Sequence, residues 1–165
     1  MAGFEIRELS GEEELLLVER YMPYPPDPLK FQRYFYQQML GWGKLLIAWK
    51  GNIPVGHIFI YFEPNFCRLG ESCPELTDLH VDPGHRRQGI ATELLYSVES
   101  QVRQNNRNKI GLEVGTDNDV AISLYVKNSY IRNPGKPEFG YYELDENGEF
   151  EQKTRICYYY TKDLN

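Results

Sequence analysis

The feature that most constrains this chain is a change of sequence period on either side of a short loop of proline, glycine and arginine. Residues 75–81 have the composition of a strand, and the chain then passes through Asp82, Pro83 and Gly84. From residue 90 onward, apolar side chains recur at spacings of three, four and seven residues, which predicts a helix to about residue 105. This succession of strand, loop and helix predicts a layered fold in which the helix covers a sheet.

The rest of the chain continues this alternation. Strands are expected at residues 4–9, 44–50, 53–61, 109–114, 130–132, 141–144 and 156–161, and helices at 11–21, 29–40 and 119–127. Ser10 and Glu13 have the spacing of a capping box, Asn118 is a plausible N-cap, and Gly51 and Gly148 mark hairpin tips. These elements predict one α/β (α+β) domain over residues 1–165, with a mixed, mostly antiparallel central sheet flanked by helices on both faces.

The composition argues against several functional classes. The apolar runs are too short to span a membrane and the N-terminus lacks the pattern of a signal peptide, so we expect a cytoplasmic protein. A formal charge of −6 argues against a nucleic-acid partner and mildly favours a cationic substrate. Cys67, Cys73 and Cys157 form no CxxC pair, so neither a metal site nor a disulfide between Cys67 and Cys73 is expected.

The loop has the chemistry of a diphosphate cradle. A helix that begins after residues 83–89 presents unpaired backbone N–H groups, and its dipole favours an anion there. Gly89 lets the chain approach a phosphate without a Cβ, while Arg86 and Arg87 add charged donors, whose hydrogen bonds are worth about 1.5–3 kcal/mol each. The segment lacks both the P-loop lysine and the glycine triplet of a dinucleotide site, so these residues alone do not identify the diphosphate.

Residues 81–91, VDPGHRRQGIA, resemble the signature of the Gcn5-related N-acetyltransferases (GNAT), in which a strand-ending valine and a proline precede [Q/R]-x-x-G-x-[G/A]. The residues that resemble the family's second pattern, about 30 positions further on, are Asn118, Ala121, Leu124, Tyr125, Lys127 and Tyr130. Ser129 stands where the family usually has glycine, and we expect an altered turn there. The resemblance implies the acyl-CoA N-acyltransferase fold, acetyl-CoA as co-substrate and no metal.

By this resemblance, backbone amides from Arg87 through Thr92 bind the pyrophosphate of acetyl-CoA. The pantetheine runs beside the end of the strand, where a main-chain N–H near Leu79 polarises the thioester carbonyl. The cofactor-binding residues implied in this way are Leu79, His80, Val81, Arg86, Arg87, Gln88, Gly89, Ile90, Ala91, Thr92, Asn118 and Tyr125.

The resemblance also implies catalytic residues. Tyr125 matches the general acid that protonates the leaving thiolate of coenzyme A. An amine must lose a proton before attack, and Glu75 and Asp78 match acidic positions in different branches of the family, with His80 as the next candidate base. Strict alternation puts Glu75 and Asp78 on opposite faces of a strand, unless a bulge changes the parity. Packing for Tyr125 and solvation for the carboxylates remain the alternatives.

The sequence therefore predicts an N-acetyltransferase that transfers acetyl from acetyl-CoA to a primary amine by direct attack in a ternary complex. A non-catalytic acyl-CoA-binding or sensing domain is the alternative, and an unrelated nucleotide-binding domain is a third possibility. The acceptor is a small-molecule or peptide amine whose specificity is expected to depend on residues 21–36 and 135–153. The sequence is compatible with a monomer or a homodimer.

Overall fold

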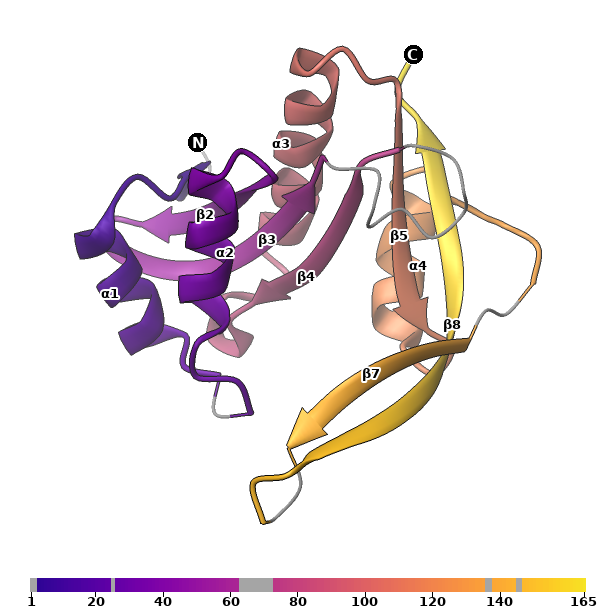
Figure 1. Cartoon of the computed structure of the whole chain (residues 1–165). Coiled ribbons are helices and arrows are strands. Elements are labelled where there is room, and N and C mark those ends of the chain that lie inside the picture. The colour runs from indigo at the N-terminus through magenta and orange to yellow at the C-terminus, as the bar shows by residue number, and fades with distance from the viewer. Residues whose placement is uncertain (1–2, 25, 63–72, 136–137, 145–146) are drawn as a thin grey trace. The chain divides into compact units, whose positions relative to one another are not determined.

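The computed structural model of the chain describes residues 3–24, 26–62, 73–135, 138–144 and 147–165 (Figure 1). The chain divides into two compact units, Met1–Ile110 with Asp163–Asn165, and Gly111–Lys162. Each unit carries strands and at least one helix of its own. The single domain expected from the sequence remains a prediction.

The first unit is built on antiparallel strands that follow one another in chain order. β1 (Glu5–Glu8) pairs with β2 (Gly43–Lys50), β2 pairs with β3 (Ile53–Tyr61), and β3 pairs with β4 (Glu75–Val81). Gly51 turns the chain between β2 and β3 with a φ of 60°. A two-residue hairpin loop needs this left-handed conformation, so the predicted hairpin is confirmed.

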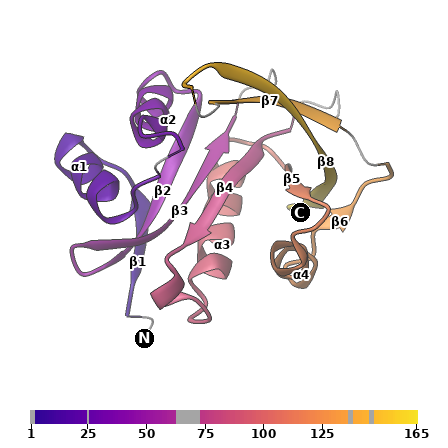
Figure 2. The same ribbon diagram turned by 90° about the horizontal axis from the view of Figure 1, so that it is seen from below.

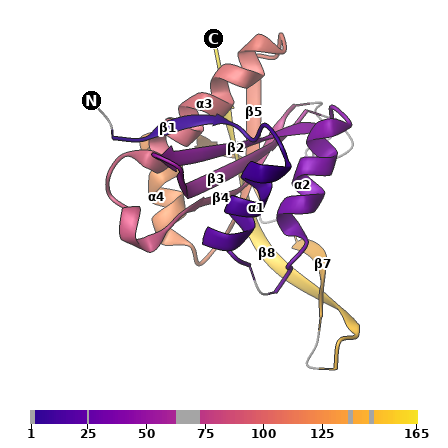
Figure 3. The same ribbon diagram turned by 90° about the vertical axis from the view of Figure 1, so that its left-hand side faces the viewer.

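Helices cover both faces of this sheet. α1 (Glu12–Tyr21) and α2 (Lys30–Met39) lie side by side on one face, and α3 (Ile90–Gln104) lies on the other (Figures 2 and 3). The apolar stripe predicted for α3 is confirmed, since none of its members is more than 2% exposed: Ile90, Leu94, Leu95, Val98 and Val102. Burial of each such side chain stabilises the fold by about 1.5–3 kcal/mol, so this stripe fixes α3 on the sheet.

The pairing of β3 with β4 is interrupted by a bulge. Phe59 pairs with Thr77 and His57 pairs with His80, so two residues of β4, Asp78 and Leu79, face a single residue of β3. Asp78 has a φ of 54°, in the left-handed region that few residues other than glycine, asparagine and aspartate adopt. The bulge shifts the alternation of side chains along β4 by one residue. Glu75 and Asp78, which strict alternation would put on opposite faces, can therefore lie on the same face.

β8 (Phe150–Asp163) is the central strand of the second unit. β7 (Glu138–Leu144) and β6 (Ile131–Arg132) pair with it in antiparallel fashion, and β5 (Lys109–Gly115) is its other neighbour. α4 (Asp119–Lys127) follows β5 in the chain. Gly148, with a φ of 80°, lies between β7 and β8 at the predicted hairpin tip. Both units are thus mixtures of helix and mostly antiparallel strand, as predicted.

The predicted capping box at the start of α1 is wrong. Gly11, not Ser10, is the N-cap, and no side chain caps the helix there. The carboxylate that receives the Ser10 N–H is Glu14, at 2.9 Å, and the same carboxylate pairs with Arg7. The N–H of Ser10 is therefore satisfied by the residue after the predicted Glu13.

The turn after α4 also differs from expectation. Ser129 has a φ of 66° and donates its N–H to the carbonyl of Val126, while Tyr130 donates to Tyr125. These two bonds form the Schellman pattern, which usually places glycine at the left-handed position. Ser129 thus adopts the conformation expected of glycine, and the expectation of an altered turn was wrong.

Candidate functional site

The loop between β4 and α3 is fixed by its own side chains. Asp82 caps the 3₁₀ turn η2 (Pro83–His85): its Oδ2 accepts from the N–H of Gly84 at 3.1 Å and lies 2.9 Å from Nδ1 of His85. The bond to His85 lowers the pKa of Asp82. Arg86 donates from Nε to the carbonyl of Val81 at 3.0 Å, which ties the loop back to the strand.

Two left-handed residues then lead into α3. Arg87 has a φ of 61° and Gly89 a φ of 84°. Gly89 is the N-cap of α3 and offers no side chain to accept from the first turn. A Cβ at this position would meet no atom of the described residues within 4 Å, so the space in front of the helix is open.

An α-helix leaves its first four N–H groups without intrahelical partners, which here belong to Gly89, Ile90, Ala91 and Thr92. The positive end of the helix dipole lies at the same place. The side chains of Arg86, Arg87 and Gln88 are exposed in the adjoining loop. The residues predicted to bind a pyrophosphate therefore lie together at one open helix end, an arrangement suited to an anion.

A second polar group surrounds the bulge in β4. Oδ2 of Asp78 lies 2.9 Å from Nζ of Lys30 in α2 and 3.0 Å from Nε2 of His57 in β3. Lys30 is 7% exposed and His57 is 1% exposed, whereas the side chain of Asp78 is 28% exposed, so the Lys30–Asp78 ion pair is partly withdrawn from solvent. Neither Lys30 nor His57 was among the predicted site residues. In the sequence, the one indication of their role is that each is a polar residue in an apolar or aromatic segment, Lys30 in residues 29–40 and His57 in residues 53–61.

The electrostatics of this group keep Asp78 ionised. Burial alone would raise the pKa of Asp78, but the hydrogen bond from His57 and the charge of Lys30 hold it below its ordinary value. Burial lowers the pKa of His57, so the ring is neutral at pH 7 and its Nε2–H donates to Asp78 in the tautomer that fits. Burial and the nearby Asp78 raise the pKa of Tyr34.

The other two candidates on β4, Glu75 and His80, share this face of the sheet. Glu75 is 8% exposed and lies opposite Tyr61, whose hydroxyl donates to Gln37 of α2 at 3.2 Å. His80 pairs with His57, and their rings stack with centroids 5.4 Å apart. Partial burial lowers the pKa of His80, and positive neighbours add to that effect against the opposing charge of Asp78. The structure therefore brings Glu75, Asp78 and His80 to one face.

The remaining predicted site residues, Tyr125 and Asn118, belong to the second unit. Tyr125 is 6% exposed, and burial raises its pKa to about 12. Asn118 is the N-cap of α4, as predicted, and its side-chain oxygen accepts from the N–H of Ala121 at 3.1 Å. The catalytic role of Tyr125 and the cofactor contact of Asn118 stay predictions.

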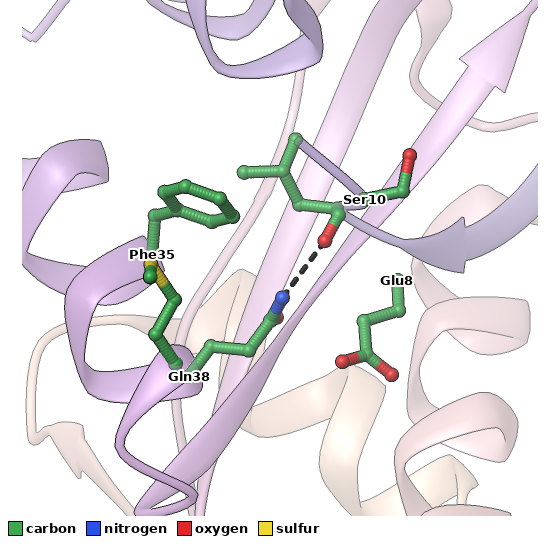
Figure 4. A pocket seen from close by; sticks show the side chains of 6 residues that line it. Glu8, Ser10, Phe35 and Gln38 are labelled. Carbon is green, nitrogen blue, oxygen red and sulfur yellow. Dashed lines mark hydrogen bonds between the residues drawn. The ribbon is translucent and has the colours of Figure 1, made fainter. Parts of the chain in front are cut away.

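Hollows on the surface of the first unit include a larger and a smaller one, and none of the predicted site residues lines either of these. The larger, of about 540 Å³, is drawn in Figure 4 and is lined by Glu8, Leu9, Ser10, Phe35, Gln38 and Met39. Among these residues, Nε2 of Gln38 donates to the carbonyl of Leu9 at 2.8 Å, the dashed bond in Figure 4. The smaller, of about 160 Å³, is lined by Glu19, Pro23, Tyr24, Asp27, Pro28 and Phe31.

The described part of the chain lacks two further kinds of feature. No helix there is both long enough and apolar enough to cross a bilayer. Those residues also contain no cluster of three or more His, Cys, Asp or Glu side chains placed to hold a metal ion. Cys73 and Cys157 are buried, whereas Cys67 lies outside the described residues.

The model of the acetyltransferase (GNAT) family matches residues 13–130, which include the loop, α3 and α4. The chain belongs to this family. The match confirms the resemblance seen in the two motifs and places the chain among the acetyltransferases. No curated protein matches the chain significantly.

Solved structures of GNAT proteins share the fold at low identity. An N-acetyltransferase from Staphylococcus aureus Mu50 has a TM-score of 0.71 and 14% identity, with 98% of this chain and 99% of that one covered. The Salmonella typhimurium acetyltransferase yncA, solved with acetyl-CoA, has a TM-score of 0.69, 14% identity and coverages of 99% and 95%. An Elizabethkingia anophelis GNAT acetyltransferase with acetyl-CoA bound has a TM-score of 0.62, 18% identity and coverages of 99% and 100%. These similarities confirm the predicted acyl-CoA N-acyltransferase fold.

Proposed function

We propose that this GNAT protein transfers the acetyl group of acetyl-CoA to a primary amine, which attacks the thioester directly while both substrates are bound. The observation that carries the proposal is the open N-terminus of α3, where Gly89 leaves the first-turn N–H groups available beside two exposed arginines. The acetyl-CoA in two proteins of the same fold supports the choice of donor.

The first turn of α3 and the side chains of Arg86 and Arg87 bind the pyrophosphate in this proposal. The N–H of Leu79, at the bulge of β4, donates to the thioester carbonyl. A donor aimed at that oxygen stabilises the negative charge that develops there on attack. The disturbed spacing of Asp78 and Leu79 against β3 supports this role, because bulges re-aim backbone groups beside active sites.

The attacking amine passes its proton to a side chain on β4. The direction in which the pKa of each candidate base is shifted distinguishes Asp78 from His80. Asp78 is held ionised by Lys30 and His57, and its lowered pKa makes it a weak base. His80 also has a lowered pKa, so its ring is neutral at pH 7 and ready to accept a proton, and its side chain is only partly buried. We therefore assign the base to His80, with Glu75 on the same face as the second candidate, and assign Asp78 to holding the bulge.

Tyr125 supplies the proton that the departing coenzyme A thiolate takes up. Burial raises the pKa of this phenol to about 12, so it carries its proton at neutral pH. In the reaction the N–C bond forms, the C–S bond breaks, His80 receives the amine proton and Tyr125 protonates the sulfur. The support for this role is the burial of Tyr125, which favours its protonated form, together with its match to the family motif.

Calorimetric titration with acetyl-CoA tests the proposal, alongside the same titration of Gly89→Glu. We expect wild-type binding and its loss in the variant, because a glutamate side chain strains the left-handed position and repels the pyrophosphate. An amine screen with detection of released thiol follows. Wild-type protein that does not bind acetyl-CoA rejects the proposal, whereas binding without thiol release for any amine favours the non-catalytic acyl-CoA-binding alternative.

The assignment of the base is tested by the pH profiles of His80→Gln and Glu75→Gln. With an aromatic amine that is already neutral across the range, wild-type kcat/KM should fall in an acid limb that lies below about pH 6.5, the ordinary pKa of histidine, because the pKa of His80 is lowered. His80→Gln should lower kcat/KM by about 100-fold, within the usual range for general catalysis, and remove this limb. A profile unchanged in His80→Gln but altered in Glu75→Gln would move the role to Glu75.

A further inference from the structure

The smaller hollow is lined by residues from the end of α1, the start of α2 and the segment between them. These two helices lie on one face of the sheet of the first unit (Figure 3). Its volume is about 160 Å³, the space of about five waters at roughly 30 Å³ each. Such a hollow admits a small head group with a few carbon atoms and excludes a large ring system. Three prolines, Pro23, Pro26 and Pro28, stiffen the chain around it.

Glu19 is the unusual member of its lining. Its Oε1 is shielded from solvent and has no hydrogen-bond partner among the described residues. A buried carboxylate oxygen without a donor is costly, and most such groups in folded proteins find one. The torsion that swings a carboxylate has broad minima, so a small rotation presents this oxygen to the hollow.

The other charges near the hollow are already paired. Both carboxylate oxygens of Asp27 bind the guanidinium of Arg33, and this bond lowers the pKa of Asp27. The ammonium of Lys30 is matched by Asp78. Glu19 is thus the negative charge of this lining that an incoming cation would neutralise.

Two aromatic rings add to the preference for a cation. Tyr24 and Phe31 line the hollow, and the chain's own Lys30 already places its ammonium 4.2 Å and 4.8 Å from their ring centroids. Rings of this kind attract an alkylammonium group through their negative faces. The combination of a carboxylate without a partner and aromatic walls suits a protonated amine and disfavours a carboxylate or phosphate ligand.

The hollow connects through ring contacts to the proposed base. Phe31 meets the edge of His57 at a centroid distance of 4.9 Å, and His57 stacks on His80 at 5.4 Å. From these observations we infer that the hollow binds a second protonated nitrogen of the acceptor, so the acceptor is a diamine or a longer oligoamine. The acetylation of that acceptor rests on the proposed function, but binding of the cation does not.

The test compares unbranched diamines of three to eight carbons with monoamines of the same length. Without acetyl-CoA, NMR titration should show diamines shifting the signals of Tyr24 and Phe31, with an affinity about tenfold above that of the matched monoamine. Glu19→Gln should remove this tenfold preference, because it should weaken diamine binding more than monoamine binding. With acetyl-CoA, the same variant should raise KM for diamines with little change in kcat.

Glu13→Gln is the matched control, because it removes one negative charge from an exposed position of the same helix. Equal weakening by Glu19→Gln and Glu13→Gln would show that only the overall charge matters and would overturn the inference. Equal affinity of wild-type protein for diamines and monoamines would overturn it as well. If diamines bind at the hollow but no amine is acetylated, the proposed reaction fails while the cation site stands.

Discussion

The helices α3 and α4 begin in opposite ways. At α4, the side chain of Asn118 accepts from the N–H of Ala121, so the protein itself satisfies part of the first turn. At α3, Gly89 occupies the same position with a φ of 84° and no side chain, and the space in front of it is open. The same four N–H groups are thus partly satisfied within α4 and left available at α3.

The capped start of α4 stabilises the fold, whereas the uncapped start of α3 leaves N–H groups available for a ligand. A capped end is worth about 1 kcal/mol to the fold, so an uncapped end forgoes a stabilising contact. At α3 the long buried stripe from Ile90 to Val102 makes up for this, because the burial of its five apolar side chains holds the helix on the sheet. The shorter α4 has Tyr125 as its one buried side chain and depends more on its ends.

The largest expected effect comes from placing aspartate at the N-cap of each helix in turn and measuring the affinity for acetyl-CoA. Gly89→Asp adds a negative charge where the pyrophosphate is proposed to bind, at a left-handed position that aspartate tolerates better than most residues. We expect acetyl-CoA affinity to fall by at least about 100-fold, since two charge-assisted hydrogen bonds of about 1.5–3 kcal/mol are at stake. Calorimetry measures the loss.

Asn118→Asp is the matched control, because aspartate caps a helix as well as asparagine does. If Asn118 acts only as the cap of α4, the acetyl-CoA affinity of this variant should stay within about twofold of wild type. Similar losses in both variants would mean that added negative charge anywhere weakens binding, and the open end of α3 would no longer explain it.

The second-largest expected effect is a loss of stability of the first unit at acid pH. The pKa of His57 in the folded chain lies below its unfolded value near 6.5, so the unfolded state binds more protons as the pH falls below that value. Stability of the first unit should therefore drop between pH 6.5 and 5, by at most about 1.4 kcal/mol per pH unit for this group. Asp78, whose pKa is also lowered, adds to the loss only below about pH 4, near its unfolded value.

Urea unfolding followed by tryptophan fluorescence reports this unit, because both tryptophans of the chain, Trp42 and Trp49, lie in it. His57→Gln should flatten the dependence between pH 6.5 and 5, while His80→Gln, at a more exposed ring, should flatten it less. An unchanged slope in His57→Gln would show that the ring is not held neutral by the fold.

Removing the cap of α4 should have a smaller effect that spares the cofactor. Asn118→Ala deprives the N–H of Ala121 of its acceptor and should lower the free energy of unfolding by about 1 kcal/mol. Hydrogen exchange in the amides of α4 should accelerate, while those of α3 stay protected. An equal loss of acetyl-CoA affinity would instead indicate that Asn118 contacts the cofactor, as the family motif implied.

The comparison also shows what a sequence can and cannot predict. Gly89 and Asn118 were predicted correctly as an open and a capped helix start, because each depends on one residue and its immediate neighbours. The bulge at Asp78 and the buried Lys30 were not predicted, because both depend on contacts between α2, β3 and β4 that lie far apart in the chain. Ser129 was misjudged because a serine can take up a conformation that usually belongs to glycine when the Schellman bonds hold it there.

The smallest expected effect is that of Ser129→Gly on the free energy of unfolding, which tests the C-terminal end of α4. The serine holds a φ of 66° that costs an ordinary residue about 1 kcal/mol relative to glycine, so Ser129→Gly relieves strain in the folded chain. Glycine also raises the entropy of the unfolded chain, which offsets part of the gain. We expect a net stabilisation of a few tenths to about 1 kcal/mol by urea unfolding, with acetyl-CoA affinity unchanged. A destabilised variant would mean that the hydroxyl of Ser129 contributes more than the backbone strain costs, and α4 would then owe its C-terminal end to a side chain as well as its N-terminal one.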